Sequence, residues 1–395
     1  SLGVVLIRRV QRQSGDLRLK RLQHIWIAKL SLTLFLLYVG WIPQLDPASS
    51  QTWGYDPQRY YVQAQELVAN NWVPNFVSLN YIGVLYYYGF LFAILGHNPV
   101  VPALMNAFAT LIATLLLVDI GYRIKPDRGP KDWYISLALL FPEVLWYDVM
   151  TSRETLCMSL LTIMLLVAGR CLINRRRVSP LWSVLVVGGA AFGIGLVRTP
   201  MLIPAIIALA LLAYVLRGLS THRWVRRAFI IMGFALLIGV PIISTSMGSY
   251  RFRYKDVLKR VEKGNTDYLL KGSHQWSKNS IGQLLIPDTP VQAVLFVAPR
   301  ALLYLVAPLP SFRVTLSGLM HGSWGDWQFL CVAFSALLNI TLFPLALASL
   351  IHAAANRRQA CMPFVFHIPY WVIFASIVAG NHIIHVRYRV MAALL

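Results

Sequence analysis

The acidic residues that could accept a proton lie directly beside apolar segments of this chain. Asp56 and Pro57 open the stretch DPQRYYVQAQELVANNW, which follows the first apolar run. Its apolar residues recur at helical spacing, so we expect an amphipathic helix on the membrane surface with Asp56 at its start. The residues on its apolar face are Tyr60, Ala64, Leu67 and Val68. Asp56 is then either an acid of a functional site or a helix-start residue favoured by the helix dipole.

Three more acids occur in the stretch FPEVLWYDVMTSRE. Glu143 lies inside the end of an apolar run, where a carboxylate is costly unless it is paired or used, so it is a site candidate. The structural alternative is a buried glutamate that pairs with Arg153 or Arg198. Asp148 and Glu154 follow in a short polar turn, and both are candidates for a second functional acid.

Basic residues gather in two places that could bind an anion. SYRFRYKDVLKRVEKG contributes Arg251 and Arg253, and HVRYR near the end contributes Arg387, Tyr388 and Arg389. The forked guanidinium group of arginine suits phosphate in particular. The alternative for the first run is a solvated face or one that binds lipid headgroups.

The histidines and cysteines do not predict a metal site. His382 and His385 have no third ligand at a suitable spacing, so we expect no metal. The cysteines stand alone in apolar surroundings, which is typical of buried packing residues and not of a disulfide framework. They are Cys157, Cys171, Cys331 and Cys361.

The composition indicates the kind of protein in which these residues lie. The chain has 395 residues, of which 57% are hydrophobic and 13% charged, with a mean hydropathy of +0.60. These values exclude a soluble globular domain and indicate a multi-pass membrane protein. We interpret the net charge of +21 against the membrane and expect no nucleic-acid partner, because basic cytoplasmic loops set the orientation of helical bundles.

Apolar runs long enough to cross a bilayer as helices recur along the chain. They lie near 25–43, 100–121, 133–149, 155–173, 181–197, 200–217, 228–246, 327–352 and 362–381. Two further runs, 79–95 and 291–309, carry tyrosines and glycines or Pro299, Arg300 and Pro308. Such residues are typical of interfacial or re-entrant segments.

The basic loops select one topology. If both ambiguous runs stay outside, the N-terminal basic segment and the loops RIKPDRGPK, RCLINRRR, RGLSTHRWVRR and NRR all face the cytoplasm. We therefore predict an all-α, polytopic transmembrane bundle of about 9–10 spans. It forms a single domain, 1–395, with a cytoplasmic N-terminus and outer regions at 44–99, at 247–326 and after 381. We expect the first apolar run to stay as an anchor and a further span to follow Leu395.

Several short motifs along the chain resemble those of a known family. The pieces are GYDPQRYYVQAQEL, NYIGVLYYYGFLFAILG, NAFATLIATLLLVDIGYR, LALLFPEVLWYDVMTSRETL, GLVRTPMLIPA, LYLVAPLPSF and HVRYR. Their order resembles the GT-C superfamily of membrane glycosyltransferases, and most of all its protein mannosyltransferase and aminoarabinose transferase-like branch. Two features depart from that pattern. The acidic pair, commonly Asp-Glu, is Asp56-Pro57 here, and SLNYIG replaces the usual Lys-Pro-Pro.

The resemblance implies sugar transfer from a polyprenyl-phosphate donor on the outer face of the bacterial inner membrane. The acceptor would be a glycan, a lipid or a protein, as in enzymes of cell-envelope polysaccharides. Asp56 matches the first acid of the family's loop motif, so it is expected to act as general base, with Asp148 or Glu154 as the second acid. Arginines would hold the phosphate leaving group without a nucleotide or another cofactor.

The remaining roles follow by position. The residues expected to bind phosphate are Arg59, Arg387, Arg389, Arg251, Arg253 and Arg300. The further substrate-binding candidates are Glu143, Arg153 and His385. Tyr60, Tyr86, Tyr87 and Tyr388 would line the sugar or the prenyl chain. The alternative for these tyrosines is an aromatic belt at the membrane surface.

Other functions fit parts of the pattern. A polymerase or ligase of lipid-linked oligosaccharides would share the basic outer face and use a diphosphate-linked donor. A non-catalytic subunit on an inherited fold would tolerate replacement of Asp56 and would bind membrane-protein partners. A transporter should show inverted repeats, and the sequence shows none.

Overall fold

All regular elements that the structure describes are helices. This computed structural model describes residues 3–5, 7–8, 20–45, 56–74, 82–124, 132–173, 179–198, 201–215 and 223–246, with scattered positions between 295 and 348. Among these residues there is no strand, which agrees with the predicted all-α class. The predicted outer region 247–326 and the chain after 348 lie almost wholly outside the described residues.

The helices are named in chain order. They are α2 (Lys20–Leu36), α3 (Asp56–Ala69), α4 (Ile82–Leu95), α5 (Val100–Ile124), α6 (Asp132–Leu140), α7 (Pro142–Asp148), α8 (Arg153–Ile173), α9 (Pro180–Val197), α10 (Leu202–Val215) and α11 (Arg223–Ser246). A π-helical turn, Leu37–Trp41, continues α2 and passes into a 3-10 turn, Ile42–Leu45.

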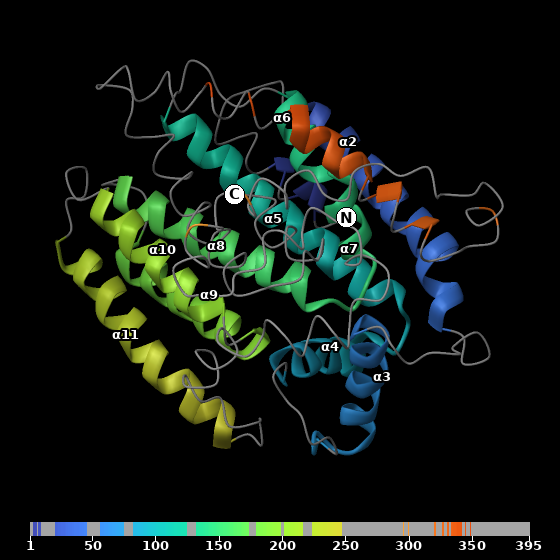
Figure 1. The fold of residues 1–395 in the computed structure, drawn as a ribbon, viewed down its shortest axis with the longest axis horizontal. Helices are drawn as coiled ribbons and strands as arrows, with labels where there is room; N and C mark the ends of the chain where they lie inside the picture. The colour runs from blue at the N-terminus through green and yellow to red at the C-terminus, as the bar shows by residue number, and fades with distance from the viewer. Residues whose placement is uncertain are drawn as a thin grey trace.

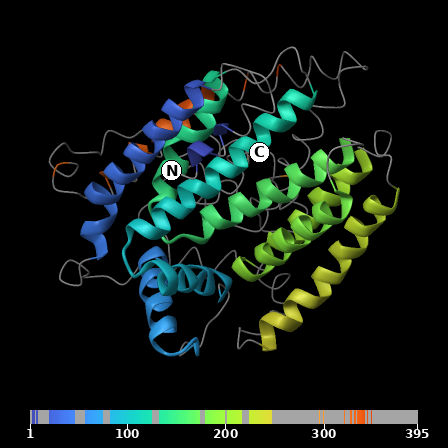
Figure 2. The same ribbon diagram turned by 180° about the vertical axis from the view of Figure 1, so that it is seen from behind.

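Helix α8 lies at the centre of the helical assembly. It packs against α5, α7, α9 and α10, and α11 covers the far side of α9 (Figure 1). Helices α2 and α11 form opposite flanks in both views, while α3 and α4 cross each other at one edge (Figure 2). The α3–α4 pair therefore stands apart from the long helices and touches them at one end.

Several helices have the length and composition needed to cross a membrane. These are Arg21–Trp41, Arg153–Leu172 and Pro180–Val197, to which Ile82–Leu95 with Val100–Leu116 adds a fourth candidate if the bent pair is one span. The bend between α4 and α5 is 116°, so the two helices are roughly perpendicular. That geometry fits the interfacial or re-entrant character predicted for 79–95. The larger number of spans stays a prediction.

The apolar run 133–149, expected as one helix, is divided into α6 and α7. Pro142 has no backbone N–H to continue the helical ladder. The backbone N–H of Glu143, which would bond to the carbonyl of Leu139 in a continuous helix, donates to Ser335 Oγ instead at 3.0 Å. The break therefore leaves the Leu139 carbonyl available to another donor.

The apolar face predicted for α3 is confirmed. Tyr60, Ala64 and Leu67 are buried in the cluster that joins α3 to α4 and α8. Tyr61 is half-buried and donates its hydroxyl to the carbonyl of His97 at 2.6 Å. Burial raises the pKa of Tyr61 and a hydrogen bond with Gln65 lowers it, with burial the larger effect. The phenol therefore keeps the proton with which it holds α3 beside the start of α5.

The cysteine prediction is confirmed where the structure describes it. Cys157, Cys171 and Cys331 are buried free thiols. Cys361 lies outside the described residues. The three described thiols thus act as small apolar packing groups.

Candidate functional site

The start of α3 lies against the turn between α7 and α8, residues 149–152. Thr151 Oγ1 donates a hydrogen bond to the carbonyl oxygen of Pro57 at 2.5 Å. Asp56 is the first residue of α3 and immediately precedes Pro57, although its side chain lies outside the described residues. Two segments far apart in the sequence therefore meet at the residue next to Asp56.

Helix α8 begins in a cluster of charges next to the same turn. Glu154 Oε1 accepts hydrogen bonds from Arg153 Nε at 3.2 Å and from Arg198 Nη1 at 3.4 Å. The glutamate side chain is 4% exposed, while those of Arg153 and Arg198 are 15% and 12% exposed. We call these three residues the arginine–glutamate cluster.

The position of Arg198 follows from the end of α9. Its backbone N–H still bonds to the carbonyl of Ile194, but its dihedral angles leave the helical range, so the chain turns away at this residue. Met201 then donates to the carbonyl of Arg198 and leads into α10. The side chain is thereby directed from the end of α9 to the first turn of α8.

The arginine–glutamate cluster has the charge expected of a site for an anion. Two guanidinium groups and one carboxylate give it a net positive charge. The partial positive charge of a helix N-terminus adds to this field, because Arg153 and Glu154 occupy the first turn of α8. A guanidinium group bonds well to phosphate oxygens, so a phosphate is the ligand class that the cluster suits.

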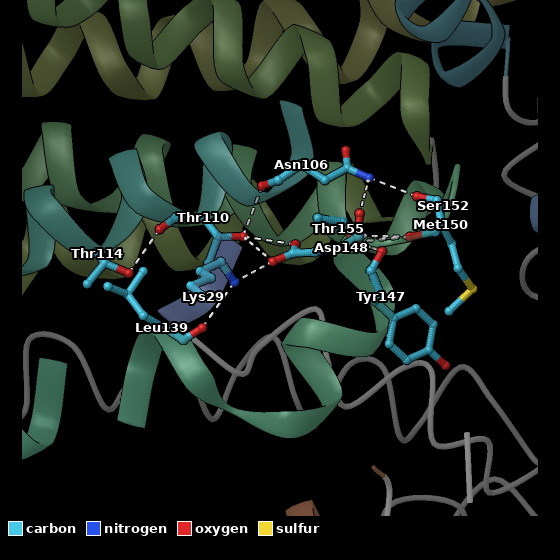
Figure 3. A network of polar contacts seen from close by, with 10 residues as sticks. All are labelled: Lys29, Asn106, Thr110, Thr114, Leu139, Tyr147, Asp148, Met150, Ser152 and Thr155. Carbon is cyan, nitrogen blue, oxygen red and sulfur yellow. Dashed lines mark hydrogen bonds and ion pairs between the residues drawn. The ribbon is translucent and has the colours of Figure 1, made fainter. Parts of the chain in front are cut away.

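A second carboxylate lies on the other side of the turn in a different environment. Asp148 Oδ2 lies 2.5 Å from Lys29 Nζ, and both side chains are 0% exposed (Figure 3). Thr110 Oγ1 lies 3.0 Å from Asp148 Oδ1 and 3.3 Å from Oδ2. Lys29 also donates to the carbonyl of Leu139 at 3.0 Å, the group left available by the break at Pro142. We call Lys29 and Asp148 the buried pair.

The buried pair joins α2, α7 and, through Thr110, α5. A buried charge is tolerated when it is paired and hydrogen-bonded, and here each charge has both kinds of partner. Full burial also keeps water and any large ligand away from Asp148. Of the two candidates for the second acid, Glu154 is thus buried between two partly exposed arginines, and Asp148 is enclosed in a fully buried polar network.

The other predicted site residues are spread over the structure. Arg59 is exposed on α3, and Tyr60 is buried between α3 and α4. Glu143 is buried at the start of α7, while Arg153 and Arg198, considered as its partners, bond to Glu154. The candidates outside the described residues are Arg251, Arg253, Arg300, His385, Arg387, Tyr388 and Arg389, which stay predictions.

The tyrosines of α4 have separate surroundings. Tyr86 stacks on Trp72 with ring centroids 6.0 Å apart and donates its hydroxyl to the Trp72 carbonyl at 3.2 Å. Tyr87 is half-buried and contacts Tyr88 edge-on. Tyr86 therefore helps to hold α4 against the end of α3, whereas the ring contact of Tyr87 lies within α4. The expected contact of both tyrosines with sugar or prenyl chain stays a prediction.

Two residues that organise this region, Lys29 and Thr151, were missed in the sequence, and Arg198 was linked to Glu143 although it bonds to Glu154. Lys29 is the only charged residue within the apolar run 25–43, which is the signal of a paired intramembrane charge. Arg198 lies between two apolar runs, at a turn that the predicted topology places on the outer side. Thr151 carries no signal of its own, because its role depends on which helix start packs against it.

The comparisons with known proteins return no match: no family model, no curated protein and no solved structure is similar to the chain. Among the residues that the structure describes, no three His, Cys, Asp or Glu side chains gather as metal ligands would. The region brings the start of α3, whose first residue is Asp56, against the turn that leads into the arginine–glutamate cluster.

Proposed function

We propose that this protein is a membrane glycosyltransferase that moves a sugar from a polyprenyl-phosphate donor to an acceptor hydroxyl. The observation that carries the proposal is the hydrogen bond from Thr151 to Pro57. It joins the start of the Asp56 helix to the turn that leads into the arginine–glutamate cluster. A proton acceptor and a phosphate-binding charge are the two parts that this reaction needs.

Asp56 has the role of general base in this mechanism. Its carboxylate accepts the proton of the acceptor hydroxyl while that oxygen forms a bond to the anomeric carbon of the sugar. The bond from the anomeric carbon to the phosphate oxygen breaks, and its electron pair leaves with the polyprenyl phosphate. General base catalysis of this kind contributes about 10²–10⁴ in rate.

Arg153 and Arg198 have the role of stabilising the leaving phosphate. The negative charge on the phosphate grows as the glycosidic bond breaks, so fixed cationic donors lower the energy of the transition state more than that of the bound donor. Glu154 orients both guanidinium groups, since its Oε1 accepts a hydrogen bond from each. We assign Glu154 as the second acid of the site.

The lipid-linked substrate suits a site at the membrane surface. We place the N-terminus in the cytoplasm and the α3–α4 pair on the outer side of a bacterial inner membrane, as the basic loops predict. Phe90, Ile94 and Leu95 of α4 are exposed apolar side chains. In this orientation they face lipid near the site, where a prenyl chain would approach from the bilayer.

The test is sugar transfer by the full chain in nanodiscs supplied with a panel of radiolabelled polyprenyl-phosphate sugars. We expect Asp56→Asn to lower kcat by at least about 100-fold, the contribution of a general base. The matched control is Glu66→Gln, which neutralises an exposed carboxylate on the same helix and should leave transfer unchanged.

Full transfer by Asp56→Asn would show that Asp56 is not the general base and that another group accepts the proton. Absence of transfer from every monophosphate donor would overturn the proposed donor class. A parallel panel of diphosphate-linked oligosaccharides then separates an oligosaccharide polymerase or ligase, which uses them, from a non-catalytic subunit, which uses neither.

A further inference from the structure

The turn between α7 and α8 is braced by side chains from helices around it. Asn106 of α5 donates its amide to the carbonyls of Asp148 at 3.1 Å and Met150 at 2.8 Å. Thr155 of α8 donates its hydroxyl to the carbonyl of Tyr147 at 2.9 Å (Figure 3). The carbonyls at the end of α7 and in the turn thus bond to side chains of two other helices.

A third helix completes the bracing. The hydroxyl of Tyr88, on α4, lies 3.1 Å from the carbonyl of Ser152 and 3.2 Å from Asn106 Oδ1. Ser152 Oγ lies 3.3 Å from the backbone nitrogen of Thr155 and so caps the first turn of α8. A turn with so many directional contacts has one favoured conformation, because each alternative leaves a buried polar group unbonded.

The buried pair fixes the end of α7, where this turn begins. Asp148 is the last residue of α7, and its carboxylate is held by Lys29 of α2 and by Thr110 of α5. The ammonium group of Lys29 also binds Leu139 at the end of α6. One side chain thereby sets the position of both helices that flank the break at Pro142.

A continuous series of contacts runs from this pair to the start of α3. Lys29 holds Asp148, the braced turn follows Asp148 directly, and Thr151 within the turn donates to Pro57. The residue after the turn is Arg153, which begins the arginine–glutamate cluster. The buried pair is therefore connected both to the start of α3 and to the arginine–glutamate cluster.

We propose that Lys29 and Asp148 are positioning residues for sugar transfer, which hold the α7–α8 turn so that the start of α3 stays beside the arginine–glutamate cluster. This inference rests on the proposed function for its catalytic consequence. Neither residue touches substrate, because both side chains are fully buried. Asp148 thus acts through the turn and not as a second acid.

The alternative is that the buried pair contributes only to stability. Buried ion pairs can often be replaced by apolar groups of similar volume without loss of stability. The double variant Lys29→Met/Asp148→Leu therefore separates the two roles. It removes both charges, and Thr110 keeps the carbonyl of Asn106 as an acceptor. The apolar pair restores packing but does not reproduce the hydrogen bonds that orient the turn.

The experiment compares wild type, the double variant and the control Thr114→Val. Among the residues that the structure describes, Thr114 donates to the Thr110 carbonyl within α5 and to no other helix, and valine has nearly the same shape. We expect the double variant to unfold within about 5 °C of wild type in nanodiscs. Its kcat should fall at least about 10-fold, since small misplacements of reacting groups cost that much or more. The donor KM should change less than about twofold, because no phosphate contact is lost.

A second readout is independent of catalysis. Nitroxide labels at Glu66→Cys on α3 and Leu185→Cys on α9, both exposed positions, report the distance between these helices. They are introduced into a chain whose four native cysteines are replaced by alanine. We expect a single narrow distance distribution in the reference chain, a broader one with the double substitution and no broadening with Thr114→Val.

The two readouts separate failure of this inference from failure of the proposed function. If the double variant is stable, keeps a narrow distance distribution and retains wild-type kcat, the pair is only structural and the inference is overturned. If the wild type transfers no sugar but the distribution broadens in the double variant, the proposed function fails while the positioning of α3 by the buried pair stands.

Discussion

Two carboxylates on either side of one turn have opposite surroundings in this protein. Asp148 faces one lysine in a region that is 0% exposed. Glu154 faces two arginines whose side chains are 12% and 15% exposed. The two acids have similar chemistry and nearly the same sequence position. Their environments nevertheless suit one of them to hold helices together and the other to organise a charged ligand.

Among the described residues, the two carboxylates differ in the number of cationic partners, which is one for Asp148 and two for Glu154. Asp148 has one cationic partner, so its removal would leave a carboxylate buried without compensation. Glu154 would keep one arginine if the other moved to a ligand. A site that must exchange partners during a reaction needs that redundancy, whereas a structural contact does not.

The largest expected effect compares one substitution in each region. Lys29→Met should lower the free energy of unfolding by about 3–5 kcal/mol, because Asp148 is left buried and unpaired. Arg198→Met should lower it by about 1 kcal/mol, because Glu154 retains its contact with Arg153. Unfolding in mild detergent against an increasing mole fraction of SDS measures both values.

Equal losses from the two substitutions would show that burial does not distinguish the regions. If the proposed function is correct, the two substitutions should have the opposite order of effect on sugar transfer by the folded protein. Arg198→Met should lower kcat by about 100-fold or more, the usual loss when a donor to a developing negative charge is removed. The residue that matters less for folding is then the one that matters more for chemistry.

The sequence was sufficient for features that depend on local pattern. The spacing of Tyr60, Ala64 and Leu67 predicted the buried face of α3, and apolar length predicted α5, α8 and α9. The positive-inside argument assigned the Asp56 stretch and the turn that follows Asp148 to the same side, and these segments are in contact.

The pairing of distant charges could not be predicted from the same patterns. Lys29 and Asp148 are 119 positions apart, so their contact depends on which helices pack together and on the break at Pro142. In the sequence, Arg153 and Arg198 are equally plausible partners of Glu143 and of Glu154, and the expected partner, Glu143, is wrong. Only the turn of the chain after α9 directs Arg198 to Glu154 and not to the other acid.

A second prediction uses a steric change that should disturb the arginine–glutamate cluster but not the buried pair. A methyl group at Gly83 in α4 would lie 2.7–2.9 Å from Cβ and backbone atoms of Leu196 in α9, two residues before Arg198. Gly83→Ala should therefore push α9 away and destabilise the protein by about 1–3 kcal/mol. It should weaken the contact of Arg198 with Glu154 and leave the buried pair intact.

The matched control is Gly189→Ala on α9, where an added methyl group meets no atom within 4 Å. That change should be neutral or stabilising by up to about 1 kcal/mol, since alanine favours helix. The measurements are SDS unfolding and sugar transfer for both variants. Equal behaviour of the two alanines would show that the close approach of α4 to α9 does not support the arginine–glutamate cluster.

The smallest expected effect concerns the link between the two regions. Tyr88→Phe removes the hydroxyl that lies near the Ser152 carbonyl and Asn106 Oδ1. One hydroxyl proton serves one acceptor at a time, so we expect a loss of about 1–2 kcal/mol in unfolding free energy, as for one buried hydrogen bond. Tyr87→Phe removes a neighbouring hydroxyl outside this network and is the control.

The fall in kcat caused by Tyr88→Phe shows how much this one hydrogen bond contributes to holding the α7–α8 turn. The turn also keeps the contacts of Asn106 and Thr155, so loss of one hydroxyl should lower kcat only a few-fold, less than loss of the buried pair. A loss as large as that of Lys29→Met/Asp148→Leu would make α4, and not the buried pair, the main support. The variant that lowers kcat further therefore identifies the main support of the turn, which is either the Tyr88 hydroxyl of α4 or the buried pair that joins α2 to α7.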